Sequence, residues 1–348
     1  MKSENTKLLF VYQNYYNVAT ALGLTFKRIF NEMLTDFSSF RVKPISNNIK
    51  LGRVLNRIRP FKQLHFQSQN EQLINRVKRE KPDVLFIIKG TDIKPQTLRR
   101  IRTAHSGITL ACFNPDDPFN PASSNSRIVE SIALYDHYFI WANRLVQPIL
   151  DVGAKACTYL PFGTDTKVIF PIEKKEFRYD LTFVGSGDNE RYHWIKQIVK
   201  ESKASKTDFN ISIFGNNWPK IPGVEIFTHV DGLDFLERIS YSRVNLNILR
   251  KQNKGSNNMR TFEIPAAGGF MLHEYSNEAI TIFDQNKEAV YFKNPGEVVE
   301  QTKYYLENEF ERKKIAMAGF KKAINFPQTY EARIQKILEK LTVTAATA

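Results

Sequence analysis

Residues Asn257–Glu274 read N-N-M-R-T-F-E-I-P-A-A-G-G-F-M-L-H-E, and the interpretation of the chain starts from this stretch. The pattern predicts one short helix that ends at Gly268-Gly269 and is followed by an apolar strand, Phe270–Leu272. Asn258 and Arg260 stand at the start of the predicted helix. Unpaired backbone N–H groups, the helix dipole and a guanidinium would all favour a bound anion there.

A carboxylate belongs to the same predicted helix. Glu263 follows Arg260 by three residues, which places the two side chains on one helix face, one turn apart. A cation for phosphate beside a carboxylate for sugar hydroxyls would suit a nucleotide-binding helix. The same residues are equally compatible with an ordinary surface ion pair followed by a glycine cap. Taken alone, they leave both interpretations open.

Strands and helices alternate along the chain on both sides of one interruption. Val84–Ile88 is continuously apolar, as strands buried on both faces of a parallel sheet are. Residues 161–171 contain one glycine and two prolines, and the alternation restarts with the strand Tyr179–Val184. This pattern predicts an α/β protein with two doubly wound Rossmann-like domains. We expect the domains to cover 1–165 and 166–325, and a C-terminal helix within 326–348 to pack back on the first domain.

The composition limits the class of partner. The chain has 348 residues, of which 42% are hydrophobic and 25% are charged, with a formal net charge of +14. This charge favours anionic partners, which include nucleic acid, anionic lipid and phosphorylated substrates. No basic run with interleaved aromatic residues resembles an RNA-binding motif, so nucleic acid is the least favoured of the three.

The cysteines and the apolar runs bear on location. Cys112 and Cys157 are the only cysteines and have no C-x-x-C spacing, which favours a reducing cytoplasm and no zinc site. No run approaches the roughly 20 apolar residues of a membrane helix, and the first residues lack a signal-peptide pattern. We therefore expect a cytoplasmic protein.

Ligands of open α/β sheets bind beyond the carboxyl ends of the strands. Gly185-Ser186-Gly187 follows a predicted strand and would let a phosphate approach the backbone closely, although a plain strand-to-helix turn explains it as well. Asp116-Asp117 could supply a general base or hold a divalent cation, or could be solvated carboxylates in a proline-flanked turn. The residues selected by this rule are Lys89, Gly90, Asn114, Asp116, Asp117, Gly185, Ser186, Gly187, Asn216, Arg250, Lys254, Asn257 and Asn258.

Several motifs together resemble one family. The linker P-F-G-T-D-T-K-V-I-F-P at 161–171 resembles the segment that joins the two domains of GT-B glycosyltransferases. R-T-F-E-I-P-A-A-G-G-F-M-L at 260–272 resembles the signature of the CgeB-like (spore-maturation) branch of the group 1 glycosyltransferases. Four shorter motifs fit the same branch in order: I-I-K-G at 87–90, F-N-P-D-D-P at 113–118, Y-D-L-T-F-V-G-S at 179–186 and I-F-G-N-N-W at 213–218.

The resemblance implies roles for residues of the second domain. Glu263 would hold the ribose of a nucleotide, and Arg260 with the Gly185-Ser186 backbone would hold its diphosphate. Many group 1 enzymes carry a second glutamate eight residues before the position of Glu263, where this chain has Gly255. The contact to the sugar would then fall to Asn257 or Asn258.

The implied activity is transfer of a sugar from a nucleoside-diphosphate sugar to a glycan, lipid-linked or other acceptor. The two domains of such enzymes face across a cleft, and Lys89, Gly90 and Asn114 would lie on the acceptor side. Arg260, helped by Arg250 or Lys254, would stabilise the departing diphosphate without a metal or other cofactor. Asp116 or Asp117 would act as the base if the transfer inverts configuration.

Two alternatives remain at this point. A nucleotide-sugar epimerase shares the fold and would use the same donor pocket. A basic nucleic-acid-binding protein would use the net charge, and its binding to DNA or RNA would depend steeply on salt.

A basic segment of the first domain could contact a membrane. Its charges could lie against an anionic bilayer at the inner face of the membrane, receive an anionic glycan or lipid-linked acceptor, or only aid solubility. The segment consists of the basic residues Arg53, Arg57, Arg59 and Lys62, with Ile58 and Phe61 between them.

Overall fold

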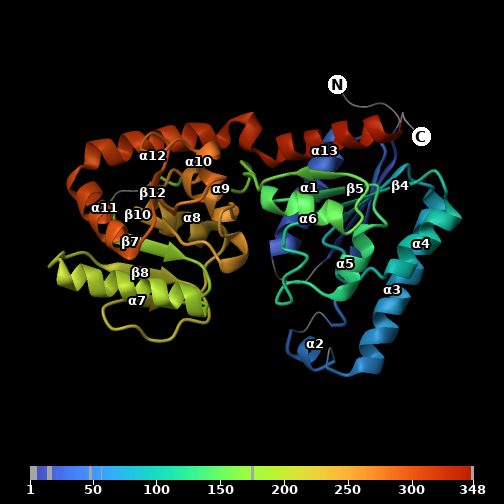
Figure 1. Ribbon diagram of the computed structural model, residues 1–348, viewed down its shortest axis with the longest axis horizontal. Helices are drawn as coiled ribbons and strands as arrows, with labels where there is room; N and C mark the ends of the chain where they lie inside the picture. The colour runs from blue at the N-terminus through green and yellow to red at the C-terminus, as the bar shows by residue number, and fades with distance from the viewer. Residues whose placement is uncertain (1–5, 14–17, 47–48, 56, 174–175, 346–348) are drawn as a thin grey trace. The chain divides into compact units, whose positions relative to one another are not determined.

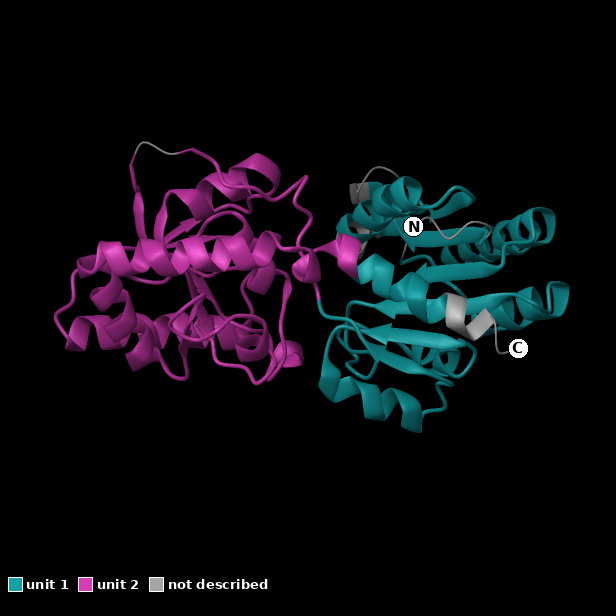
Figure 2. Cartoon of the chain, turned by 90° about the horizontal axis from the view of Figure 1, so that it is seen from above, with its two compact units in different colours: residues 1–161, 333–348 teal, residues 162–332 magenta. Residues whose placement is uncertain are grey.

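A computed structural model describes residues 6–13, 18–46, 49–55, 57–173 and 176–345 (Figure 1). The chain divides into two compact units, which Figure 2 shows in different colours. Unit 1 comprises Met1–Pro161 and Arg333–Ala348, and unit 2 comprises Phe162–Ala332. The predicted boundaries, after residues 165 and 325, fall near these two crossings.

Unit 1 is built on one sheet of six strands in the order β2-β1-β3-β4-β5-β6, and all of these pairs are parallel. The strands are β1 (Leu8–Gln13), β2 (Phe37–Val42), β3 (Val84–Ile88), β4 (Thr109–Asn114), β5 (His137–Ile140) and β6 (Cys157–Tyr159). The helices are α1 (Val18–Met33), α2 (Ile49–Leu55), α3 (Arg59–Glu80), α4 (Pro95–Ala104), α5 (Ser126–Ile132) and α6 (Val146–Asp151).

The burial of the central strands explains why this sheet is parallel and covered. Every residue of β1 and of β3 is buried, and successive strand residues point to opposite faces, so helices must cover both faces. One face carries a cluster of phenylalanines in which Phe10 and Phe30 have ring centroids 5.4 Å apart and Phe26 and Phe113 stack at 5.7 Å. These rings supply much of the apolar core of unit 1.

Unit 2 repeats the architecture with the strand order β12-β11-β10-β7-β8-β9, again with parallel pairs. The strands are β7 (Tyr179–Val184), β8 (Ile211–Phe214), β9 (Glu225–Phe227), β10 (Ser242–Asn247), β11 (Met271–Glu274) and β12 (Val290–Phe292). The helices are α7 (Asn189–Ala204), α8 (Gly232–Ser240), α9 (Met259–Ala266), α10 (Ala279–Ile282), α11 (Pro295–Glu307) and α12 (Glu309–Ile324). Two six-stranded parallel sheets with helices confirm the predicted class, two doubly wound Rossmann-like domains.

The last helix, α13 (Tyr330–Ala345), begins in unit 2 and continues into unit 1. Within unit 1, Arg333 Nε donates to the carbonyl oxygen of Pro161 at 3.0 Å, and Lys336 Nζ donates to that of Tyr159 at 3.1 Å. These bonds attach the N-terminal half of α13 to the end of β6. No helix in the described part of the chain is long and apolar enough to cross a membrane.

Candidate donor site in unit 2

Residues Asn257–Glu274 contain α9 and β11, and α9 begins at the carboxyl end of the sheet of unit 2. Asn258 is the N-cap of α9: its side-chain oxygen accepts from Thr261 N at 3.0 Å, while Thr261 Oγ1 accepts from Asn258 N at 3.1 Å. The Asn258 amide also exchanges two hydrogen bonds, of 3.0 and 2.9 Å, with Asn247 at the end of β10. The start of α9 is therefore fixed to the sheet by buried amides.

A buried histidine supports the same helix end. His273 on β11 has no exposed surface, and its Nδ1 donates to the carbonyl oxygen of Glu274. Its Nε2 therefore carries the lone pair and accepts from Thr261 Oγ1 at 2.8 Å. Burial lowers the pKa of His273 to about 4, so the ring is neutral at pH 7. The residue therefore supports the start of α9.

Arg260 projects from the first turn of α9 to the end of β7. Its Nε donates to the carbonyl oxygen of Val184 at 3.2 Å, its Nη1 pairs with Glu263, and its guanidinium lies 4.2 Å from the ring centroid of Phe235. The side chains of Arg260 and Glu263 are 27% and 11% exposed, so the pair is mostly covered. The predicted placement on one helix face is therefore correct, and about a quarter of the Arg260 side chain is still exposed.

The glycines predicted at the phosphate site have a packing role. A Cβ on Gly187 would lie 2.6 Å from the carbonyl oxygen of Asn217. A Cβ on Gly215 would collide with the carbonyl oxygen of Gly185. The loops after β7 and β8 can approach this closely only because both positions are glycine. Gly187 N donates to the carbonyl oxygen of Asn216 at 2.8 Å, which occupies that N–H within the loop.

Arg191 holds these loops to β10 and was not selected from the sequence. Its Nε and Nη2 donate to the carbonyl oxygen of Ile248 at 3.2 and 2.9 Å, and its Nη1 donates to that of Ser186 at 3.1 Å. Burial, with the nearby charge of Arg250, lowers its pKa to about 10. A signal was present, because Arg191 precedes Ile195 and Ile198 at helical spacing, on the buried face of α7.

Two further cations reach the same edge. Arg250 Nε lies 3.6 Å from the carboxylate of Asp188, the N-cap of α7, and its side chain is 48% exposed. Lys254 pairs with the buried Glu274 and lies 3.3 Å from Glu190. Each of these cations, like Arg260, thus has a carboxylate within 4 Å. The site is therefore a network of paired charges. The sequence suggested an excess of cations here, but in these contacts every cation has a carboxylate partner.

The two asparagines considered for the sugar are turned inward. Asn258 is 8% exposed and holds the N-cap, and Asn257 has no exposed surface. Asn257 Nδ2 donates to the carboxylate of Glu278 at 3.0 Å, which also accepts from Ser256 Oγ at 2.6 Å. Both amides contribute to the scaffold under α9 in this structure.

The acceptor-side and base candidates lie in unit 1, at the ends of β3 and β4. Lys89 and Gly90 both have positive φ, 61° and 70°, in the turn after β3. Lys89 Nζ lies 2.6 Å from Asp116, and Arg144 Nη2 lies 3.2 Å from Asp117. Asn114 is buried and accepts from Asp116 N at 3.0 Å. The structure therefore gives each candidate carboxylate a cation, and the donor candidates form a separate set in unit 2.

Metal binding was considered for Asp116-Asp117. Within the described ranges, no three His, Cys, Asp or Glu side chains are grouped so that they could hold a metal ion. Cys112 and Cys157 are free thiols, and burial raises the pKa of both to about 12.

Comparison with known proteins finds one family whose model matches part of the chain. Residues 191–339 match the family described as glycosyl transferase-like. This match includes α9 and most of unit 2. A search of curated protein sequences finds no match to the chain.

Solved structures share the fold over almost the whole chain. HepE from Anabaena, solved with UDP-glucose, is 10% identical with a TM-score of 0.62, over 97% of this chain and 100% of that one. A glycosyltransferase from Rickettsia africae is 11% identical with a TM-score of 0.66, over 97% and 98%. A protein from Listeria monocytogenes described as a putative UDP-N-acetylglucosamine 2-epimerase is 11% identical with a TM-score of 0.57, over 98% and 97%. At these identities the likeness establishes the fold alone.

Proposed function

We propose that the protein is a glycosyltransferase that takes a sugar from a nucleoside-diphosphate sugar bound to unit 2. The observation that carries the proposal is the position of Arg260. The guanidinium is fixed beside Val184 and Glu263 at the carboxyl end of β7, within the segment that matches the glycosyl transferase-like family. HepE was solved with UDP-glucose, which makes a uridine-diphosphate sugar the first donor to test.

Each polar group of the site then has a role. Arg260 and the half-exposed Arg250 bind the diphosphate together with Lys254 and the N-terminus of α7, where the helix dipole favours an anion. Glu263 binds the ribose hydroxyls. Because Arg260 already contacts Glu263, one residue orients the other, and both meet the nucleotide in a fixed geometry.

Catalysis in this proposal consists of stabilising the negative charge that develops on the departing diphosphate. Arg260 and Arg250 supply that stabilisation. The acceptor, a glycan or lipid-linked molecule, binds to unit 1 near Lys89, Gly90 and Asn114. If transfer inverts configuration, Asp116 or Asp117 accepts the proton of the attacking hydroxyl. The motif at 260–272 supports placing the chain in the CgeB-like branch.

A nucleotide-sugar epimerase is the second candidate, because the Listeria protein shares the fold. The two activities have different products. Incubation with a uridine-diphosphate sugar and no acceptor should leave the sugar's stereochemistry unchanged by NMR, whereas an epimerase would convert it.

We also propose that catalysis needs no divalent ion, since Arg250, Lys254 and Arg260, each within 4 Å of a carboxylate in this structure, would contact the diphosphate in place of a metal. Activity should be retained within about twofold after treatment with a chelator. Loss of activity in chelator and recovery with magnesium or manganese would contradict this, and would make Asp116 and Asp117 the first ligands to test.

Peripheral contact with an anionic membrane remains part of the proposal, for a protein located in the cytoplasm. The side chains of Arg53 and Arg59 lie outside the described residues. Large apolar side chains of α2, of α3 and of the turn between them are exposed in the same segment, at spacings of three and four residues: Leu51 (51%), Val54 (56%), Ile58 (43%), Phe61 (59%) and Leu64 (67%). An apolar row with cations beside it is what an interfacial helix presents to a bilayer.

Vesicle sedimentation tests this contact. Each basic residue near an anionic surface contributes about 1 kcal/mol, so the wild type should bind phosphatidylglycerol vesicles at low salt and phosphatidylcholine vesicles much more weakly. Replacing Arg53, Arg57, Arg59 and Lys62 by glutamine should abolish the difference. Equal binding of the wild type to both lipids would show that these charges serve solubility alone.

A further inference from the structure

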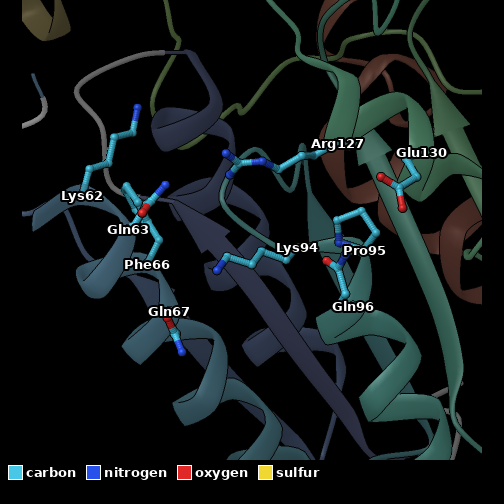
Figure 3. A pocket seen from close by; sticks show the side chains of 9 residues that line it. All are labelled: Lys62, Gln63, Phe66, Gln67, Lys94, Pro95, Gln96, Arg127 and Glu130. Atoms are coloured by element: carbon cyan, nitrogen blue, oxygen red, sulfur yellow. The ribbon is translucent and has the colours of Figure 1, made fainter. Parts of the chain in front are cut away.

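Unit 1 contains a hollow of about 580 Å³ between α3, α4 and α5 (Figure 3). Three cations line it, one from each helix or its start: Lys62 from α3, Lys94 from the start of α4 and Arg127 from α5. Lys94 and Arg127 extend from their helices toward α3 in Figure 3. The remaining lining residues are Gln63, Phe66, Gln67, Pro95, Gln96 and Glu130.

A buried amide fixes the wall that carries Lys94. Asn70 of α3 is 3% exposed, and its Oδ1 accepts from Lys94 N at 3.0 Å and from Thr97 Oγ1 at 2.6 Å. Its Nδ2 donates to the carbonyl oxygen of Asp92 at 2.8 Å. Asn70 thus bonds to the backbone of Lys94, the N-cap of α4, and to the side chain of Thr97, and it holds the start of α4 against α3.

The carboxylates around the hollow are engaged by other cations. Glu130 pairs with Arg99 at 3.1 Å, and Glu71 pairs with Arg100, whose Nη2 lies 2.9 Å from its Oε2. Among the residues that the structure describes, Lys62, Lys94 and Arg127 form no ion pair. Glu71 offsets part of the charge of Lys94, and Glu130 also lines the hollow. Like charges that are only partly compensated repel one another, and a bound anion reduces that cost.

The hollow lies at the edge of the sheet where ligands of this fold bind. Lys94 ends the loop that leaves β3, and Arg127 begins α5 after the loop that leaves β4. Both loops leave the carboxyl ends of their strands, as do the acceptor-side residues Lys89 and Asn114. The hollow and the proposed acceptor region therefore belong to the same edge of unit 1.

We propose that this hollow binds a phosphate group of the acceptor, with Lys94 and Arg127 as its principal ligands. Lys62 and the glutamine amides complete the site, the amides by bonding to oxygens next to the phosphate. That the phosphate belongs to an acceptor rests on the proposed function. That unit 1 binds phosphate does not depend on it.

The test is a titration of the full-length protein with inorganic phosphate at constant ionic strength, with UDP present to occupy the donor site. Hydrogen–deuterium exchange should show protection of segments 60–68, 94–98 and 125–130 that saturates with phosphate. The double variant K94Q/R127Q should bind phosphate at least tenfold more weakly. The variant K78Q/R79Q, which removes two exposed cations from the other end of α3, should bind it as the wild type does.

The outcomes separate this site from the donor site. Unchanged phosphate affinity in a folded K94Q/R127Q protein, or an equal loss in K78Q/R79Q, would overturn the proposal. UDP affinity, measured separately, should be the same in all three proteins. If UDP does not bind the wild type, the proposed function is wrong. The phosphate titration still decides whether the hollow binds phosphate.

Two further probes identify the carrier of the phosphate. Glucose 6-phosphate represents a soluble phosphorylated glycan, and vesicles containing phosphatidic acid represent a lipid carrier. One of the two probes should bind K94Q/R127Q at least tenfold more weakly than the wild type, and K78Q/R79Q as the wild type does. That probe has the chemistry of the natural ligand. Loss with neither probe would overturn the assignment to an acceptor.

Discussion

Replacement of Arg260 by alanine should weaken UDP binding roughly ten- to a hundredfold. The guanidinium would lose its charge-assisted hydrogen bonds to the diphosphate, each with a magnitude of about 1.5–3 kcal/mol. The change also leaves Glu263, which is 8% exposed, without its cation, so some loss of stability should accompany it. Isothermal titration calorimetry with UDP measures the first effect, and thermal unfolding measures the second.

Arg243→Ala is the matched control. Arg243 lies at the start of β10, the opposite end from the donor site, and pairs with Asp180 at 2.9 Å. The Arg243→Ala substitution should leave UDP affinity unchanged. Glu263→Gln should weaken binding of UDP more than that of inorganic pyrophosphate, because only UDP has a ribose. An Arg260→Ala protein that is folded and binds UDP normally would remove this residue from the donor site.

Acid should destabilise unit 2 through His273 well before its carboxylates are protonated. The pKa of His273 is lowered to about 4 by burial, against 6.5 in an exposed side chain. As the pH falls below 6.5, His273 binds a proton in the unfolded chain but not in the folded protein. The free energy of unfolding therefore decreases from pH 6.5 down to about 4. Between pH 7 and pH 5 the expected loss is about 2 kcal/mol.

Urea unfolding at the two pH values measures this loss. His273→Gln should reduce the difference between them, whereas His193→Gln, at an exposed position of α7, should retain it. The neutral ring accepts a hydrogen bond from the hydroxyl of Thr261, which belongs to the capped first turn of α9. Protonation of the ring would break this bond and disturb the turn that carries Arg260. UDP affinity should therefore fall only as the pH approaches about 4, where the folded protein takes up this proton. An unchanged pH dependence in His273→Gln would assign the acid sensitivity to other groups.

The central strands could be predicted from the sequence because burial on both faces gives them continuous apolar runs. β3 was recognised for this reason. β2 and β9 were missed, and both are edge strands whose residues are mostly half-buried or exposed. Such strands lack the apolar signal, and their pairing depends on the neighbouring strand.

One helix boundary was also missed. The residues of Glu311–Leu341 have a helical pattern throughout, but α12 ends at Ile324 and α13 begins at Tyr330. Pro327, in the intervening turn, was the available signal, because proline removes a helix hydrogen bond. The break occurs shortly before the chain passes from unit 2 back to unit 1.

Local patterns located the candidate donor site but not its contacts. Helical spacing placed Arg260 beside Glu263. Sequence spacing could not show that Arg191 joins the ends of β7 and β10, because that contact links residues 57 positions apart. Nor could it show that Arg250 and Lys254 have carboxylate partners, since those pairs depend on the folded sheet.

Binding of nucleoside diphosphates and their sugars to the wild-type protein tests the central claim most directly. In a thermal-shift screen, one nucleoside-diphosphate sugar at about 100 times its dissociation constant should stabilise the protein by about 2.7 kcal/mol. We expect uridine diphosphates to give the largest shift. If no nucleoside diphosphate or its sugar gives a shift, while DNA or RNA binds with steep salt dependence, the protein is a nucleic-acid-binding protein and the account is wrong.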